Sequence, residues 1–201
     1  LIYLANPNSP SGTMIRKDVI RSWIERLPCP ILIDEAYVDF AEETCLSLVR
    51  ESDRVMISRT LSKSYALAGL RFGFLVAQPH IIRELRKVKD SYNCDALAIA
   101  GASAALQDQD WLRQTREKIL ATRGRLAREL RHLGFEVLPS QANFVWCSHP
   151  DREAKEIYET LKGQKVLIRY MNYPEWGDGL RITVGTDPEV DVLLDKLRKI
   201  L

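Results

Sequence analysis

Residues 55–77 read VMISRTLSKSYALAGLRFGFLVA, two short apolar runs separated by a polar loop that holds a lysine and two arginines. The runs VMIS and FGFLVA contain few polar residues, which is typical of strands buried on both faces of a sheet. Two runs of the same kind precede them, LIYLA at 1–5 and PILID at 30–34. An ammonium group is costly to bury, so Lys63, directly after a buried strand, needs a chemical explanation.

Helical patterns alternate with these strands. Apolar residues recur at helical spacing from about Ile15 to Leu27, and the segment PHIIRELRKVKD begins with Pro79, a residue favoured in the first turn of a helix. Strands that alternate with helices predict an α/β fold with a mostly parallel sheet.

The pattern changes after about Ala96, where an alanine-rich segment leads into a long amphipathic helix that Gly134 ends as a C-cap. The rest of the chain predicts a smaller α+β unit, with strands at FEVLP, NFVWCS, VLIRYM and LRITVG and helices at REAKEIYETLKG and PEVDVLLDKLRKIL. We therefore predict two domains, residues 1–115 and residues 116–201, joined by the long helix.

Composition excludes several classes of protein. A chain of 201 residues with 46% hydrophobic content can bury a proper core, and a net charge of +2 gives no reason to expect a nucleic-acid partner. No apolar stretch is long enough to predict a membrane span. The four cysteines form no C-x-x-C pair and the three histidines lie far apart, so we expect no disulfide framework, no metal site and a reducing cytoplasm.

Polar residues follow three of the predicted strands. Asn8 and Ser9 follow the first strand, Asp34 ends the second, and Lys63 follows the third. Because ligands of open α/β sheets bind beyond the carboxyl ends of the strands, we expect these groups to converge on one edge. Each alone has an ordinary explanation, since Asp and Asn are common in turns and helix caps and a lysine after a strand is usually solvated.

The string ILIDEAY at 31–37 also fits a second enzyme class. Four apolar residues before Asp-Glu are typical of a Walker B strand, which would indicate a P-loop ATPase. That class also needs the string G-x-x-x-x-G-K-[ST], which does not occur in these residues. The ATPase interpretation is weakened, although such a loop upstream would restore it.

The combination of motifs resembles the fold-type I pyridoxal-phosphate aminotransferases, and within them the histidinol-phosphate aminotransferases. The resemblance covers the whole chain, through NPNSPSGT, DEAYVDF, RTLSKSYALAGLRFG and LRITVGT in this order. The string S-K-x-x-x-L-A-G-L-R-x-G is the most specific of them. The fold implied is part of the large cofactor-binding domain, followed by the small C-terminal domain.

The resemblance assigns roles around a pyridoxal 5'-phosphate cofactor. Lys63 would form the Schiff base with the aldehyde, after burial and neighbouring cations favour the neutral amine, and would then carry the proton between Cα and the cofactor. Asp34 would pair with the ring nitrogen and keep it protonated, so that the ring takes up electrons. Tyr37 would donate a hydrogen bond to the phenolic oxygen of the ring.

The remaining roles concern two anions. Ser62 and Arg71 would hold the cofactor phosphate, with Thr60 as a further candidate. The substrate residues implied are Arg181, which binds the acidic end of the substrate, Arg169 as the second cation for a phosphate dianion, and Asn143 as a structural or substrate contact.

The sequence departs from the family pattern N-P-N-N-P-T-G at two positions. Ser9 stands where the family has the asparagine that contacts the ring oxygen, and Ser11 replaces threonine. The contact falls either to Asn8 or to Ser9, and Asn8 is our candidate.

The chain also begins within a strand, so we expect a fragment that lacks the family's N-terminal portion. The resemblance then implies a homodimer when full length, with small-molecule partners, an amino donor and a phosphorylated substrate. We expect the fragment alone to bind the cofactor poorly, to aggregate and to be inactive.

Rival interpretations remain within and outside the family. Threonine-phosphate decarboxylase and aromatic aminotransferases share the motifs, and the substrate side chain is read largely by the segment we expect to be missing. A catalytically silent module of this fold, such as the ligand-sensing half of a transcription regulator, would carry a DNA-binding domain upstream.

Overall fold

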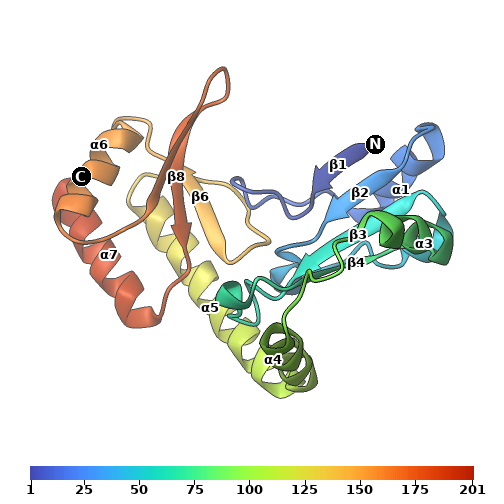
Figure 1. The fold of residues 1–201 in the computed structure, drawn as a ribbon. Helices are drawn as coiled ribbons and strands as arrows, with labels where there is room; N and C mark the ends of the chain where they lie inside the picture. The colour runs from blue at the N-terminus through green and yellow to red at the C-terminus, as the bar shows by residue number, and fades with distance from the viewer. The chain divides into compact units, whose positions relative to one another are not determined.

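A computed structural model describes residues 1–201, which form two compact units. The first unit comprises Leu1–Asn8 and Met14–Arg116, and the second comprises Ser9–Thr13 and Glu117–Leu201. Each unit has its own four-stranded sheet and hydrophobic core (Figure 1). None of the helices combines the length and the apolar composition needed to cross a membrane.

The first unit alternates strands and helices, as the sequence predicts. Its elements are β1 (Ile2–Ala5), α1 (Lys17–Arg26), β2 (Ile31–Asp34), η1 (Val38–Phe40), α2 (Leu48–Glu51), β3 (Val55–Thr60), η2 (Ala68–Leu70), β4 (Gly73–Val76), α3 (Pro79–Val88) and α4 (Ala96–Gln107). The strand order is β1-β2-β3-β4, with β1, β2 and β3 parallel. The predicted α/β class with a mostly parallel sheet is confirmed.

Strand β4 runs antiparallel to β3. A parallel neighbour needs a crossover of a dozen or more residues, usually a full helix. The link between β3 and β4 contains only the three-residue η2, so the chain returns from the end at which β3 finished. The loop between β3 and β4, which holds Lys63, therefore lies at the carboxyl end of β3.

The core of the first unit lies on one face of its sheet. The alternating residues of β2 and β3 that point to this face pack against α1 and α2, and the fully buried members include Ile20, Ile31, Ile33, Leu48, Val55 and Ile57. Since side chains alternate along a strand, Tyr3 and Asp34 project from the opposite face. The side chain of Asp34 thus lies away from the packed core.

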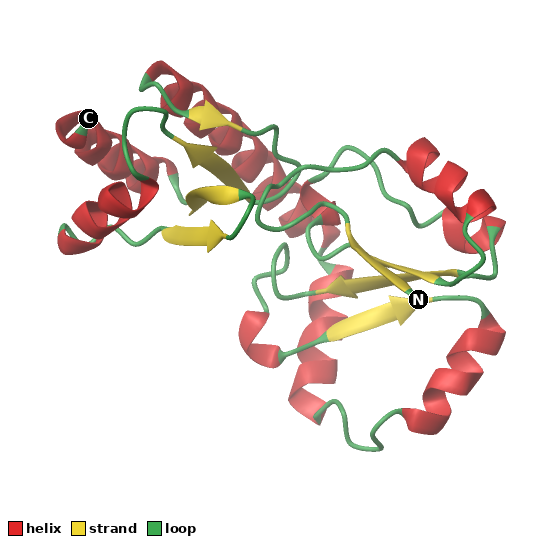
Figure 2. Ribbon diagram, turned by 90° about the horizontal axis from the view of Figure 1, so that it is seen from above, coloured by secondary structure: helices red, strands yellow, loops and turns green.

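The second unit is built from antiparallel strands and three covering helices (Figure 2). Its elements are β5 (Glu136–Val137), β6 (Phe144–Ser148), α6 (Ala154–Gly163), β7 (Arg169–Tyr173), β8 (Gly177–Thr183) and α7 (Asp187–Ile200), together with most of α5 (Gln109–His132). The strand order is β5-β6-β8-β7. Leu126, Leu130, Ile157, Leu161, Leu180 and Leu197 are fully buried between the sheet and the helices.

Helix boundaries follow local signals. The side chain of Asp95 accepts a hydrogen bond from the amide of Ala98 at 2.8 Å and starts α4. Gly134, with φ of +88°, follows α5, and the amide of Phe135 bonds the carbonyl of Leu130 at 3.0 Å. This confirms the prediction that Gly134 is the C-cap, because glycine adopts this conformation without strain.

Several predicted strand boundaries are wrong. The strand expected at LRITVG (180–185) is β8 at Gly177–Thr183, and the one expected at FEVLP is reduced to β5 at Glu136–Val137. The segment VLIRYM was expected to be extended from Val166, whereas β7 begins at Arg169. The amide of Val166 bonds the carbonyl of Leu161 at 2.9 Å, and Lys165 has φ of +63°. Lys165 and Val166 therefore close helix α6, and pairing with β8 starts only at Arg169.

Candidate active site

The carboxyl edge of the first sheet brings together residues that are far apart in the sequence. Asp34 ends β2, and its register partners are Ala5 on β1 and Ser58 on β3. Its Oδ2 atom accepts a hydrogen bond from the Tyr3 hydroxyl at 2.5 Å, and its Oδ1 atom accepts one from the amide of Ala36 at 3.1 Å. Two donors thus fix this carboxylate.

The loop between β3 and β4 holds Lys63. Its base is closed by the amide of Leu61, which bonds the carbonyl of Phe72 at 3.1 Å. The hydroxyl of Ser64, a buried residue, donates to the Asp39 carboxylate. Lys63 is held between these two anchors.

The Lys63 ammonium lies over the ring of Tyr37, with Nζ 5.4 Å from the ring centroid. This separation allows a cation–π attraction and brings together an amine and a phenol from different loops. Lys63 itself is exposed. The expectation that it is buried is wrong for these residues, because β3 ends three positions earlier and the loop carries the lysine off the sheet.

Two hydroxyls and a guanidinium flank the lysine. The Thr60 and Ser62 hydroxyls lie 2.9 Å apart, and the amide of Ser62 donates to the Thr60 hydroxyl at 3.1 Å. Arg71 adopts φ of +53°, and its Nη1 atom donates to the carbonyl of Ala68 at 3.0 Å. Arg71 is exposed, and its remaining N–H groups are available for an anion.

A buried ion pair supports this edge. The Glu35 side chain is 1% exposed and accepts from Arg59 at 2.7 Å. It also accepts from the Thr44 hydroxyl at 2.9 Å and from the amide of Cys45 at 2.5 Å. Because Glu35 follows Asp34 and Arg59 lies on β3, the pair ties the ends of β2 and β3 together.

The turn after β1 is fixed by an asparagine that the sequence analysis did not select. The Asn6 side chain accepts from the amide of Ile15 at 2.7 Å and donates to the carbonyl of the same residue at 2.9 Å. Asn8, the predicted cofactor contact, is half-buried two residues later. Asn6 therefore shapes the turn that carries Asn8.

The predicted substrate residues lie in the second unit. Arg169 on β7 and Arg181 on β8 are directly opposed partners in the antiparallel ladder, so both project from the same face. The guanidinium carbon of Arg181 lies 5.1 Å from the centroid of the Phe144 ring, and its Nη1 atom donates to the Ser9 hydroxyl at 3.0 Å. Two cations thus stand side by side.

Arg181 retains unused hydrogen-bonding capacity. Its Nε atom is buried and has no hydrogen-bond partner. A buried donor without a partner carries a desolvation cost, which a bound anion would remove. Arg169 and Arg181 also line one hollow of about 720 Å³, together with Lys165. The apolar wall of this hollow contains Val166, Leu167, Ile168, Pro188, Val192 and Leu193.

Asn143 directly precedes β6, and its carbonyl accepts from the amide of Val184 at 2.9 Å. This bond is made by the main chain, so it is independent of the side chain. The substrate-contact role of Asn143 stays a prediction.

Comparison with known families identifies the class of protein as the aminotransferases, which is the class expected from the motifs at the two sheets. Residues 1–197 match the model of the family "Aminotransferase class I and II". The chain therefore belongs to this family, which confirms the resemblance found in the sequence.

Within this family, the chain is similar to proteins named histidinol-phosphate aminotransferase. The chain is 57% identical over 194 residues to the histidinol-phosphate aminotransferase of Rhodopirellula baltica, covering 96% of this chain and 54% of that protein. It is 48% identical to histidinol-phosphate aminotransferase 1 of a Nostoc species, covering 99% of this chain and 56% of that protein. The chain thus spans little more than half the length of these relatives.

A solved structure shows the same fold. The histidinol-phosphate aminotransferase of Sinorhizobium meliloti, determined in complex with pyridoxal-5'-phosphate, superposes with a TM-score of 0.89 at 28% identity. The match covers 99% of this chain and 57% of that one.

Several contacts near the site were not predicted from the sequence. They involve Tyr3, the Glu35–Arg59 pair and the Ser64–Asp39 bond. Alternation along β1 places Tyr3 on one face, but only the register between β1 and β2 brings it to Asp34. No sequence signal gives this register.

Proposed function

We propose that this chain is part of a pyridoxal-phosphate-dependent aminotransferase of histidine biosynthesis. It would transfer an amino group between L-histidinol phosphate and 2-oxoglutarate, giving imidazole acetol phosphate and L-glutamate. Family membership and the names of the relatives support the reaction class. The observation that carries the substrate is the in-register pair of Arg169 and Arg181, since two guanidinium groups suit a phosphate dianion.

The donor set at the first sheet fits pyridoxal phosphate. When bound, this cofactor supplies an aldehyde for covalent attachment and a ring that takes up electrons. Asp34, with a hydrogen bond at each oxygen, would pair with the ring nitrogen, and Tyr37 would donate to the ring oxygen. Lys63, above the Tyr37 ring, would bind the aldehyde.

Four further residues complete the cofactor site. Ser62, Arg71 and Thr60 would hold the phosphate, since the segment around Lys63 supplies two hydroxyls and a guanidinium. Asn8 would contact the ring oxygen. In this sequence Ser9 has a different partner, because its hydroxyl accepts from Arg181.

Lys63 would act twice. After the substrate amine displaces Lys63, the neutral amine of Lys63 would carry the proton between the substrate Cα and the C4′ carbon of the cofactor. The ring of Tyr37 would orient this amine. General base catalysis by a positioned amine typically contributes about 10²–10⁴-fold.

The two arginines would bind the two substrates differently. The α-carboxylate of glutamate is a monoanion, and Arg181 alone would hold it, whereas the phosphate of histidinol phosphate would engage Arg169 as well. The unpartnered Nε of Arg181 supports this use. Asn143 would lie near the same substrate end.

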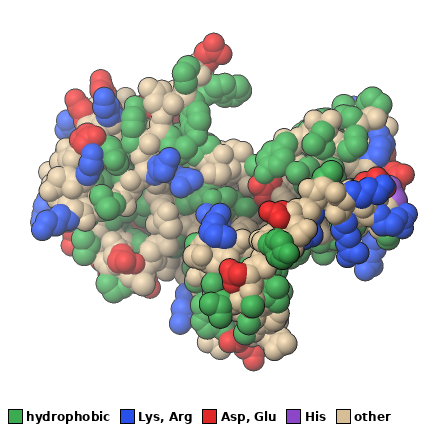
Figure 3. All heavy atoms as spheres, viewed as in Figure 1, with side chains coloured by type: hydrophobic (Ala, Val, Ile, Leu, Met, Phe, Trp, Pro, Cys, Tyr) green, Lys and Arg blue, Asp and Glu red, His purple; other side chains and the backbone are tan.

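We infer that residues 1–115 belong to the large cofactor-binding domain and residues 116–201 to the small C-terminal domain. A cytoplasmic homodimer is the proposed assembly. Hydrophobic side chains gather on the surface over α4 (Figure 3), where Leu97 and Ile99 are exposed. Exposed apolar groups of this kind support burial against further protein.

The test uses the complete gene product. Borohydride reduction in the presence of pyridoxal phosphate should attach the cofactor to Lys63, identified by peptide mass. The product should then transaminate histidinol phosphate faster than phenylalanine and should not decarboxylate threonine phosphate. A label on another lysine, or decarboxylation as the main reaction, would contradict the proposal.

A further inference from the structure

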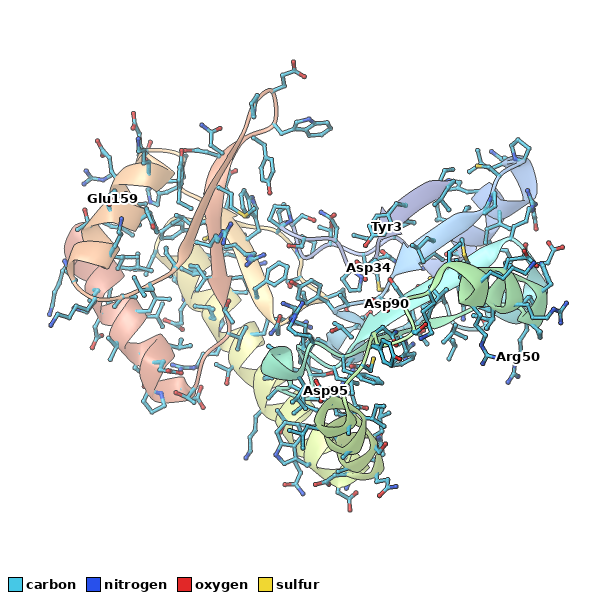
Figure 4. All side chains as sticks on the ribbon, in the orientation of Figure 1. Tyr3, Asp34, Arg50, Asp90, Asp95 and Glu159 are labelled. Atoms are coloured by element: carbon cyan, nitrogen blue, oxygen red, sulfur yellow. The ribbon has the colours of Figure 1, made fainter.

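Tyr3 has a large side chain that takes no part in the hydrophobic core of the first unit. It projects from the open face of β1 and is 61% exposed, yet its hydroxyl forms a 2.5 Å hydrogen bond to Oδ2 of Asp34. Figure 4 shows the two side chains close together at the first sheet. The hydrogen bond to Asp34 is therefore the interaction of this side chain that needs an explanation.

The backbone fixes this contact. Strands β1 and β2 are parallel, and Tyr3 is the register partner of Leu32, while Ala5 is the partner of Asp34. Tyr3 therefore reaches Asp34 diagonally, two residues along the same face, which is within range of a long aromatic side chain. The contact needs no movement of either strand.

The hydroxyl remains a donor throughout the physiological pH range. The hydrogen bond to Asp34, partial burial and the negative charge of Asp34 together raise the pKa of Tyr3 to about 12. The Asp34 carboxylate therefore accepts from two donors, Tyr3 at Oδ2 and the amide of Ala36 at Oδ1.

A carboxylate has about four lone-pair sites, so these two bonds leave one site free on each oxygen. They also fix the plane of the group, which otherwise rotates about its last torsion. We propose that Tyr3 is a positioning residue that orients the Asp34 carboxylate toward the ring nitrogen of the cofactor. This role rests on the proposed function and deepens it, because it assigns the direction of Asp34 to a residue on the neighbouring strand.

The test is the substitution Tyr3→Phe in the complete gene product. The ring and its apolar contacts are kept and only the hydroxyl is removed. We expect pyridoxal phosphate to bind about three- to tenfold more weakly to the apo-protein, because the Asp34 side chain is then free to rotate and must be ordered when the cofactor binds. The unfolding midpoint of the apo-protein should fall only slightly, because one hydrogen bond at an exposed side chain is lost.

The same substitution in an Asp34→Ala protein distinguishes a positioning role from a merely structural one. In Asp34→Ala protein, Tyr3→Phe should leave the cofactor dissociation constant unchanged, because Tyr3 acts only through Asp34. Tyr92→Phe, at a position that is 93% exposed, is the matched control and should change neither quantity.

The outcomes are distinguishable. Unchanged cofactor affinity in Tyr3→Phe, or an equal loss in the Asp34→Ala background, would overturn the role of Tyr3 while leaving the proposed function intact. Failure of the unmodified protein to bind pyridoxal phosphate at Lys63 would overturn both.

Discussion

In the first unit the candidate site residues lie at the carboxyl ends of parallel strands, whereas in the second unit they lie side by side on one face of an antiparallel pair. Asp34 and Lys63 are separated by many residues and reach the same edge through the strand topology. Arg169 and Arg181 are joined by one hairpin and meet through its register. In this chain the parallel sheet brings different chemical groups to one edge, whereas the antiparallel hairpin places two like charges opposite each other.

The two sheets also differ in how their charges are supported. The Glu35–Arg59 pair of the first unit is nearly inaccessible on the carboxylate side, with side-chain exposures of 1% and 22%. In the second unit Arg125 pairs with Asp187 and Asp191, whose side chains are 66% and 61% exposed. Buried pairs are costly to break, while exposed pairs contribute little.

The largest effect should come from the lysine of the first unit. Lys63→Ala should abolish transamination, because no other amine is anchored over the Tyr37 ring. The unfolding midpoint should remain close to that of the unmodified protein, since Lys63 is exposed. Steady-state assays and thermal unfolding measure both. Lys89→Ala is the control, and activity retained by Lys63→Ala would show that the first sheet is not the reaction centre.

The next effect concerns stability. Arg59→Ala should lower the free energy of unfolding by about 3–5 kcal/mol, because the buried Glu35 charge loses its partner. Arg125→Ala should cost at most about 1 kcal/mol, since its partners are exposed. Urea denaturation compares the two. Equal losses would show that the two units support their charges in the same way.

A smaller effect should distinguish the two arginines of the hairpin. Arg169→Ala should lower kcat/KM for histidinol phosphate by about one to two decades, the effect of losing roughly 1.5–3 kcal/mol from a charge-assisted hydrogen bond. Glutamate should lose much less, because Arg181 remains for its carboxylate. Steady-state kinetics with both substrates decide the point. Equal losses would make Arg169 structural.

The smallest effect concerns the start of α7. Thr186 and Glu189 form a capping box, in which the amide of Thr186 donates to Glu189 at 2.7 Å. Thr186→Ala should destabilise the protein by about 1 kcal/mol, and Thr186→Ser should restore it. These hydrogen bonds lower the pKa of Glu189, so its stabilising effect is present above its unfolded pKa and is lost as the pH falls through the lowered value. Urea denaturation at neutral and acidic pH tests both statements.

Some features of the candidate site could be predicted from strand positions in the sequence, whereas others depend on tertiary contacts. Asp34 and Lys63 could be selected because their positions after apolar runs place them at strand ends. The Ser9 partner could not be predicted, because the hydrogen bond to Arg181 joins residues 172 positions apart. The exposure of Lys63 could not be predicted either, since the path of its loop depends on anchors at Leu61 and Ser64.

By itself the sequence determined the class of each unit, the order of the strands along the chain and the family, because these follow from local periodicity and from motifs that are contiguous. The tertiary structure decided the antiparallel direction of β4, the register of β1 on β2 and of β7 on β8, and the partners of Asp34, Glu35 and Arg181. The physical reason is that alternation along a strand fixes only the face of a side chain. Which side chains meet on that face is set by hydrogen bonding between strands, and so Tyr3 acquires its role only when β1 pairs with β2.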